Sequence, residues 1–415
     1  MDQSRAAGPA SPETQVSTTF ERWQQGQRNE IIAASILTGP LRQTIYMAVL
    51  TLMPVIRCLE GRQMFDANAD DAARLRGMIS GYMISQVIFT TAALELADLL
   101  AETSMSAEAL AKATATHPDA LKRLLQALSA LGLVEQSEGG MFTLAAPGAL
   151  LRSDAAGSLR PLALMQGSEG TWRAWGELLH TVRTGETAFN HVFEMGAFQY
   201  RKLHPERAAK FDAYMAALTH RWVPAILASH DFSRARSIVD VGGGNGVLLS
   251  AILAAFPQAK GVVFDSPAGI GGAAPRLEKA RVSQNCRIVA GDFFDAVPEA
   301  SDTYILKSVL HDWNDEQAVT ILKNCRRAMC PESTLVVIER VLPERILPQG
   351  AHREIVMMDM HMLVATGGRE RTVSQYNAMF AAAGLAAIAA EPTRSPFTIM
   401  TAAKGSAGSA SGGKS

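Results

Sequence analysis

Residues 237–246 read SIVDVGGGNG, a short apolar run that leads directly into a cluster of glycines. The apolar stretch Val247–Ala255 follows at once, so this part of the chain predicts a strand, a tight turn and a helix. Ligands of open α/β sheets bind beyond the carboxyl ends of the strands, at turns of this kind. Glycines there let the backbone turn tightly and approach a ligand closely. The stretch therefore predicts an α/β domain with a nucleotide-type site.

Strand-like and helix-like segments alternate from this point to the end of the chain, a pattern typical of a mainly parallel sheet with helices on both faces. The candidate strands are Ser237–Val241, Gly261–Asp265, Arg287–Ala290, Thr303–Lys307, Thr334–Glu339, Ala386–Ala390 and Phe397–Ala402. The last two strands lie close together in the sequence.

The spacing of the glycines separates two classes of cofactor. A dinucleotide site needs G-x-G-x-x-G, which would put its third glycine where this chain has Val247. The glycines here are Gly242, Gly244 and Gly246. S-adenosylmethionine has no pyrophosphate to place at a helix N-terminus, so it only requires close approach to the loop. The spacing argues against a nucleotide-dependent oxidoreductase and is compatible with S-adenosylmethionine.

Acidic residues end three successive candidate strands, at Asp240, Asp265 and Asp292. A carboxylate at Asp265 can accept hydrogen bonds from both ribose hydroxyls, and Asp292 together with an aromatic neighbour can hold an adenine. Any one of these acids could equally be a helix cap or a solvated charge. Three of them at one sheet edge strengthen the prediction of an S-adenosylmethionine site.

The fourth candidate strand leads into LKSVLHDWNDE at residues 306–316, which places His311 at the same sheet edge. Imidazole has an ordinary pKa of about 6.5, so at neutral pH it can accept a proton from an attacking hydroxyl. A lone histidine is more often a structural residue, but this position favours a general base.

Six segments are similar, in order and spacing, to those of the caffeic acid and hydroxyindole type of S-adenosylmethionine-dependent O-methyltransferases, bacterial members included. They are VDVGGGNG, FDSP, GDFF, LKSVLHDWNDE, VIERVLP and GGRERT. The resemblance implies an α/β fold with a Rossmann-like methyltransferase sheet, mostly parallel with an antiparallel last strand. It also implies an N-terminal helical, winged-helix-like dimerisation domain.

By this resemblance the catalytic base is His311, and the acids that orient it are Glu339 and Glu370. The expected cofactor-binding residues, including those of the glycine turn, are Asp240, Gly242, Gly244, Gly246, Asp265, Asp292, Phe293 and Lys307. The implied enzyme is a homodimer that moves the methyl group of S-adenosylmethionine to a hydroxyl of a small aromatic or secondary-metabolite acceptor, by a one-step in-line displacement.

Two alternatives stay open. The acceptor could be a small thiol or keto acid, methylated on sulfur or carbon. A metal held by His311, Asp312 and His361 could assist this reaction. The chain could also be a cofactor-binding regulator without activity. The joint presence of His311, Glu339 and Glu370 favours catalysis.

The domain organisation that we expect has six parts. They are disordered residues 1–16, a helical N-terminal extension at 17–70, a winged-helix-like dimerisation domain at 71–160, a helical linker and acceptor-pocket region at 161–230, an S-adenosylmethionine-binding catalytic domain at 231–404 and a disordered tail at 405–415. The outline of the winged helix is two helices followed by a hairpin that turns at Gly139 and Gly140.

Composition argues against several other functions. The formal net charge of −1 gives no electrostatic reason for a nucleic-acid partner, and the second helix of the winged-helix outline has only Lys122 and Arg123 as cations. The apolar stretch from Ile45 to Ile56 is shorter than the roughly 20 residues of a membrane span. Four cysteines without paired spacing, and no secretory signal, favour a cytoplasmic protein.

Overall fold

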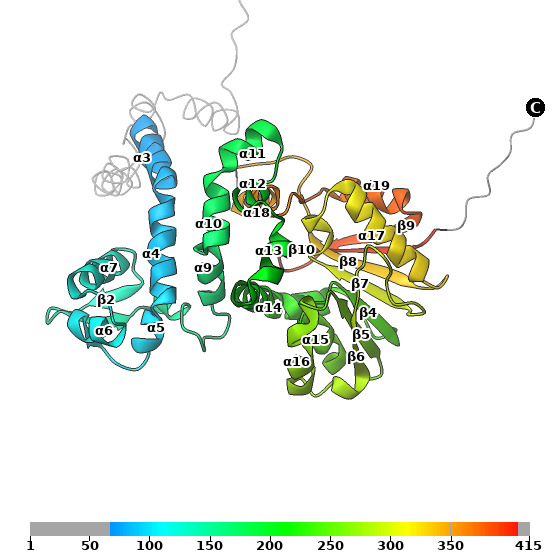
Figure 1. The fold of residues 1–415 in the computed structure, drawn as a ribbon, viewed down its shortest axis with the longest axis horizontal. Coiled ribbons are helices and arrows are strands. Elements are labelled where there is room, and N and C mark those ends of the chain that lie inside the picture. The colour runs from blue at the N-terminus through cyan, green and yellow to red at the C-terminus, as the bar shows by residue number, and fades with distance from the viewer. Residues whose placement is uncertain (1–66, 349, 406–415) are drawn as a thin grey trace, which may run out of the picture. The chain divides into compact units, whose positions relative to one another are not determined.

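The computed structural model describes residues 67–348 and 350–405 (Figure 1). The terminal segments expected at 1–16 and 405–415, apart from Gly405, and most of the helical extension expected at 17–70 lie outside the described residues. The chain divides into one unit that ends at Gly81 and a second that begins at Tyr82. Of the first unit, the structure describes helix α3 (Ala67–Ile79).

A seven-stranded sheet forms the C-terminal half of the second unit, with the order β6-β5-β4-β7-β8-β10-β9. Its strands are β4 (Ser237–Val241), β5 (Lys260–Asp265), β6 (Cys286–Ala290), β7 (Thr303–Lys307), β8 (Thr334–Arg340), β9 (Leu385–Pro392) and β10 (Phe397–Lys404). Strand β10 runs antiparallel to both of its neighbours, and the pairs among β4 to β8 are parallel. All seven predicted strands and the antiparallel last strand are confirmed.

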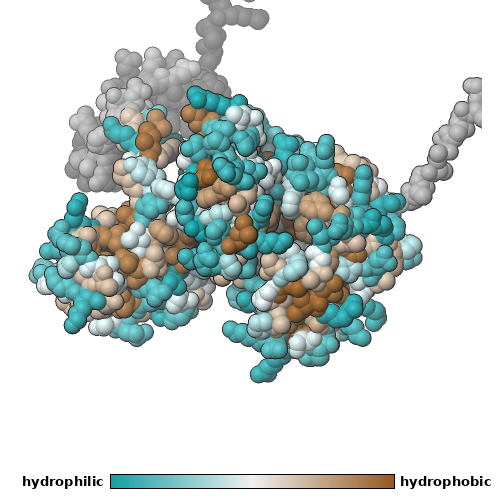
Figure 2. All heavy atoms as spheres, viewed as in Figure 1, coloured by the Kyte–Doolittle hydropathy of each residue, from teal (hydrophilic) through white to brown (hydrophobic). Residues whose placement is uncertain are grey.

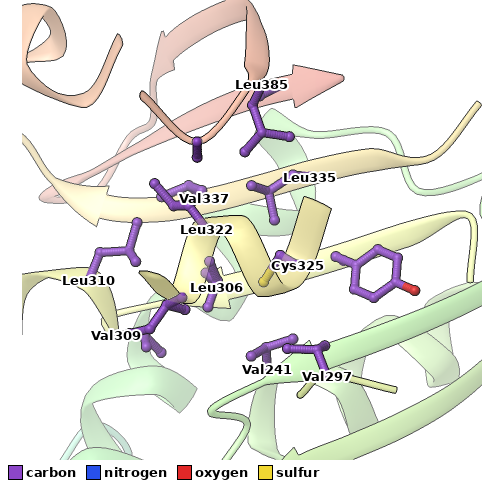
Figure 3. Packing of buried hydrophobic residues seen from close by; sticks show 14 of the residues in the cluster. Val241, Val297, Leu306, Val309, Leu310, Leu322, Cys325, Leu335, Val337 and Leu385 are labelled. Atoms are coloured by element: carbon purple, nitrogen blue, oxygen red, sulfur yellow. The ribbon is translucent and has the colours of Figure 1, made fainter. Parts of the chain in front are cut away.

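Helices cover both faces of this sheet, and its central strands are therefore buried on both sides. On one face, Val241 and Leu306 pack with residues of α17 (Asp315–Ala328) and α19 (Val373–Ala382), as Figure 3 shows in part. On the other, Ile238 and Ile305 pack with residues of α14 (Pro205–Ser229), α15 (Val247–Ala255) and α16 (Ala273–Lys279). The sheet is therefore the middle layer of three.

The N-terminal part of the second unit has its own small core. Its elements are α4 (Gly81–Ala93), α5 (Leu96–Leu99), β1 (Met105–Ser106), α6 (Ala107–Ala113), α7 (Pro118–Ala130), β2 (Val134–Gln136), β3 (Met141–Leu144) and α8 (Ala146–Ala149). The Ser106 hydroxyl caps α6 by accepting a hydrogen bond from the Ala109 amide at 3.2 Å. Gly132, with φ of +68°, follows α7 as a left-handed C-terminal glycine. Two helices followed by a hairpin were expected here, and the structure has them.

Short helices connect this part to the sheet, as the sequence predicts. They are α9 (Arg160–Gln166), α10 (Glu169–Gly176), α11 (Leu178–Thr184), α12 (Ala188–Phe193) and α13 (Ala197–Leu203), followed by the long α14. Helix α18 (Gly350–Ala365) returns from the sheet and contacts α10, α11 and α12. Among the helices that the structure describes, none combines the length and apolar character needed to cross a bilayer.

Candidate active site

The glycine turn after β4 has the backbone that only glycine adopts without strain. Gly242, Gly244 and Gly246 have φ values of +72°, +54° and +75°. A Cβ atom at Gly242 would lie 2.6 Å from Cγ2 of Val309, whereas a Cβ at Gly244 would meet no described atom within 4 Å. Gly242 is therefore packed from behind, and Gly244 faces open space in which a ligand can lie against the backbone.

Asp265, at the end of β5, is held by this turn. Its Oδ2 accepts a hydrogen bond from the Gly244 amide at 2.9 Å, and its Oδ1 accepts one from the Ser266 amide at 2.6 Å. Burial raises the pKa of this carboxyl. Each oxygen keeps further acceptor capacity, which is what two ribose hydroxyls require.

The other predicted cofactor residues lie along the same edge. Asp240, the last residue but one of β4, and Lys307, the last residue of the neighbouring strand β7, are buried. Burial raises the pKa of Asp240 to about 7, against the effect of the Lys307 charge, and burial lowers the pKa of Lys307 to about 8. Asp292 is exposed and accepts a hydrogen bond from the Phe294 amide at 2.8 Å. The Phe293 ring lies 3.8 Å from the Cβ position of Gly242, beside the turn.

His311 lies in a short 3-10 turn, η3 (Leu310–Asp312), just after β7. Its Nδ1 is 2.9 Å from Oε1 of Glu370 and 3.8 Å from Oε2 of Glu339. The imidazole is 6% exposed and the two glutamates are at most 1% exposed, so water screens this cluster weakly. The structure thus brings together the three residues that the sequence predicts as base and orienting acids.

Glu339 also fixes the backbone that leads to His311. Its Oε1 accepts hydrogen bonds from the amides of Val309 at 2.9 Å and Leu310 at 2.8 Å. Burial raises the pKa of Glu339. For His311, burial lowers the pKa but the charges of Glu339 and Glu370 raise it more strongly, to about 10. The cluster stabilises a proton on the imidazole.

Arg371 is a residue of this site that the sequence reasoning missed. Its side chain is 1% exposed and donates hydrogen bonds to the backbone oxygens of Leu310 at 2.9 Å and Trp313 at 2.8 Å, and to Oδ1 of Asp315 at 2.8 Å. It therefore holds the turn on both sides of His311. The segment GGRERT gave a signal for it, because an arginine directly follows Glu370 there.

The structure does not bring His311, Asp312 and His361, the metal ligands of the alternative hypothesis, together as one group of donor atoms. Within residues 67–348 and 350–405, two groups of at least three metal-type donors have their atoms within 4.8 Å of one another. One is His311 with its two glutamates, and the other is the more exposed set His180, Glu186 and His191. Neither contains the combination of His311, Asp312 and His361. Instead, Nδ1 of His361 accepts a hydrogen bond from Nε1 of Trp175 at 3.1 Å.

A cavity of about 2010 Å³ opens beside this site. Residues of α14, α15 and α18 line it. Figure 2 shows that apolar patches interrupt the mostly hydrophilic face of the described residues. His361 and Val247 belong to its wall, whereas His311 and the glycines of the turn do not. Of the histidines His311 and His361, only His361 lies in the cavity wall. Burial lowers the pKa of His361 to about 4, so this histidine presents a neutral imidazole to the cavity at neutral pH.

Comparisons with known proteins agree with this geometry. A family described as an O-methyltransferase domain matches residues 175–386, and an O-methyltransferase dimerisation domain matches residues 77–154. The chain is 41% identical to a phenazine O-methyltransferase, PhzM, of Lysobacter antibioticus. The 325 matched residues cover 78% of this chain and 94% of that protein.

Two further relatives show the range of chemistry among similar proteins. An 8-amino-8-demethylriboflavin N,N-dimethyltransferase of Streptomyces davaonensis is 33% identical, over 78% of this chain and 93% of its own length. A crystal structure of an O-methyltransferase from neocarzinostatin biosynthesis, NcsB1, in complex with S-adenosylmethionine and 2-hydroxy-5-methyl naphthoic acid, has a TM-score of 0.69 and 32% identity. It covers 77% of this chain and 96% of that one.

Proposed function

Because the chain belongs to the O-methyltransferase family, we propose that it methylates a hydroxyl of a small aromatic acceptor, with His311 as the general base. The enzyme uses S-adenosylmethionine, as the family does. The observation that carries the proposal is the imidazole of His311, held at Nδ1 by Glu370 and placed at the sheet edge that also bears Gly244 and Asp265.

The residues of the glycine turn and the strand ends fit S-adenosylmethionine. Gly244 opens to free space, and Asp265 keeps acceptor capacity for ribose hydroxyls. Asp240, Gly242, Gly246, Asp292, Phe293 and Lys307 would complete the cofactor site. Bound there, S-adenosylmethionine supplies a methyl group on a sulfonium that becomes the thioether of S-adenosylhomocysteine.

Glu370 sets which nitrogen of His311 does the chemistry. With the Nδ1 hydrogen donated to Oε1 of Glu370, the lone pair lies on Nε2, which has no hydrogen-bond partner in the described part of the chain. Nε2 takes the proton of the acceptor hydroxyl as the oxygen forms its new bond to carbon. The carboxylates of Glu339 and Glu370 then stabilise the imidazolium. The charges of Glu339 and Glu370 raise the pKa of His311 and so make the imidazole a stronger base towards a phenol, and the base acts in the fraction of the enzyme in which this imidazole is neutral.

An amine is the second candidate acceptor, since one relative is named as an N,N-dimethyltransferase. A neutral amine can attack through its lone pair and needs a base only to lose a proton afterwards. The buried pair of carboxylates around His311 favours the hydroxyl, because it makes the imidazole basic enough for a phenol.

The wider organisation is also part of the proposal. The match to a dimerisation domain at residues 77–154 supports a homodimer, built around the winged-helix-like region expected at 71–160. Residues 161–230 would supply acceptor-pocket walls and residues 231–404 the catalytic domain. The unpaired cysteines Cys286, Cys325 and Cys330 fit the expected cytoplasmic location.

Replacing His311 with alanine tests the proposal. The purified protein is given labelled S-adenosylmethionine and a panel of phenols, amines and thiols, and the methylated atom is identified by mass spectrometry and NMR. We expect transfer to a phenol oxygen, and a loss in kcat of about 10²- to 10⁴-fold for His311→Ala. Calorimetric binding of S-adenosylmethionine should be unchanged. His204→Gln, a change at a more exposed histidine, serves as the control. Undiminished turnover of a phenol by His311→Ala would remove His311 as the base.

A further inference from the structure

Arg201 on α13 is a cation that the reaction described above does not use. Its guanidinium carbon lies 3.9 Å from the ring centroid of Phe211 and 4.6 Å from that of Phe198. Its Nη2 atom is buried and has no hydrogen-bond partner among the residues that the structure describes. Burial lowers the pKa of this arginine, which means that the charged group lacks full compensation.

The aromatic contacts place Arg201 near the acceptor side of the active site. Phe198 stacks on Trp313, with ring centroids 5.1 Å apart and planes 9° from parallel. Trp313 follows His311 by two positions and also contacts the Phe293 ring, whose centroid is 5.9 Å away. The charges of His311 and Arg201 both lower the pKa of His361. Arg201 and the proposed base therefore act on the same small region.

The acidic groups nearest to Arg201 do not neutralise it by contact. Asp312 and Asp212 raise its pKa through their charges. Neither forms an ion pair with it within 4.0 Å in the described structure, in contrast to Arg207, which is 2.6 Å from Glu169. A buried guanidinium with a free N–H group is costly unless a partner completes it. The flat faces of the guanidinium are occupied by the rings, so its N–H edge is what remains for a ligand.

We propose that Arg201 binds a carboxylate of the acceptor, so that the substrate is an aromatic hydroxy acid. A guanidinium edge and a carboxylate are planar groups of matching geometry, joined by two parallel hydrogen bonds. The inference rests on the proposed function, since it places the carboxylate at Arg201 while the reacting hydroxyl lies at His311.

Acceptor pairs that differ only in the carboxylate test this assignment. Hydroxynaphthoic acids are compared with their methyl esters and with the corresponding naphthols, for the wild type, Arg201→Gln and Arg201→Lys. We expect the wild type to prefer the acid over the ester in kcat/KM by on the order of 100-fold, mostly through KM. Arg201→Gln should lose most of that preference and Arg201→Lys only part of it.

Arg207→Gln is the matched control, because Arg207 also lies over an aromatic ring, that of Tyr200 at 5.3 Å, but is paired with Glu169. Its ratio of acid to ester turnover should equal that of the wild type. Thermal unfolding and S-adenosylmethionine binding of each variant show whether it is folded. A wild type that turns over acid and ester equally overturns the assignment, whatever the variants do.

Binding of 2-naphthoate, which has no hydroxyl to methylate, separates this inference from the proposed function. It is measured by calorimetry in the presence of S-adenosylhomocysteine. Binding to the wild type that is lost in Arg201→Gln supports the carboxylate site, even if no phenol is methylated and the proposed function fails. Methylation of phenols without any effect of the carboxylate or of Arg201 leaves the proposed function standing and overturns the role of Arg201.

Discussion

The protonation of His311 is linked to the stability of the folded protein, because its pKa is raised on folding. Its pKa of about 10 in the folded protein exceeds its ordinary value of 6.5 because of Glu339 and Glu370, against the effect of burial. A group with a raised pKa contributes stability that is fully present below its unfolded pKa and is lost as the pH rises through its folded pKa. The stability that protonated His311 contributes should therefore decline between about pH 6.5 and pH 10.

The variant Glu370→Gln should move the pH dependence of catalysis. A glutamine still accepts the hydrogen bond from Nδ1 of His311, but it removes one of the negative charges that raise the pKa of the imidazole. Because the base acts in its neutral form, kcat/KM rises as His311 loses its proton. We expect this rising limb to lie at lower pH in Glu370→Gln than in the wild type, measured with one phenol throughout. Glu344→Gln, a change at an exposed acid, should leave the limb in place. An unmoved limb in Glu370→Gln would mean that another group controls it.

The variant Gly244→Ala should weaken binding of S-adenosylmethionine. Alanine at a φ of +54° is strained by about 1 kcal/mol, and its methyl group would fill the open space that the cofactor requires. Gly140→Ala has the same kind of strain, at a φ of +76°, in a hairpin with nothing within 4 Å of the new atom. We expect similar losses of stability in both variants, and a rise in the Kd of about 10-fold or more only for Gly244→Ala. Equal affinities would contradict the placement of the cofactor at Gly244.

At the scale of elements, the turn η3 is held by a partner far away in the sequence. Replacing Arg371 with methionine leaves the carbonyls of Leu310 and Trp313 without their buried donor. We expect the free energy of unfolding to fall by about 3 kcal/mol, measured by urea denaturation, together with a loss of kcat. Arg369→Met changes an arginine that is 53% exposed and 3.5 Å from Asp315, and should cost less than about 1 kcal/mol. A small effect of Arg371→Met would show that β8 and Glu339 suffice to hold the turn.

The elements that the sequence predicts correctly are those with local signals. Strands such as Ser237–Val241 are apolar runs that end in a glycine turn, so their limits are visible in the chain itself. Arg371 and Arg201 have no such signal, because their roles depend on which segments pack around them. An arginine in a helical or loop pattern is usually solvated, and only the fold shows that Arg371 is buried and that Nη2 of Arg201 lacks a partner.

At the scale of the molecule, the sheet order explains why one edge collects the site. Strands β6, β5, β4, β7 and β8 are neighbours and parallel, so their carboxyl ends meet at one edge. Asp292, Asp265, the glycine turn, Lys307 and Glu339 follow or end these strands in that order across the sheet. The sequence predicts that these residues meet at one edge, because right-handed connections between parallel strands allow few other strand orders, and ligands bind beyond the carboxyl ends of such strands. The cavity beside this edge is lined in large part by residues of helices outside the sheet, such as α14 and α18, and no periodicity in the sequence identifies those residues.

The proposed dimer depends on apolar residues near the start of the second unit. In α4, the side chains of Tyr82, Met83 and Ile84 are 54%, 53% and 44% exposed, within the segment that matches the dimerisation domain. Large apolar side chains exposed side by side favour burial against a partner. We expect the double variant Met83→Glu and Ile84→Glu to shift the mass in solution from twice 44.4 kDa to 44.4 kDa, measured by light scattering.

Ile388→Glu is the matched control for this change, because Ile388 is 61% exposed on β9 and lies outside the matched segment. It should leave the mass unchanged. If the partner subunit completes the acceptor pocket, the α4 variant also loses turnover while it still binds S-adenosylmethionine, since the proposed cofactor residues all lie at the sheet edge of one chain. A fully active monomer would restrict the dimerisation segment to a role in assembly, and a variant that stays dimeric would place the interface on another surface.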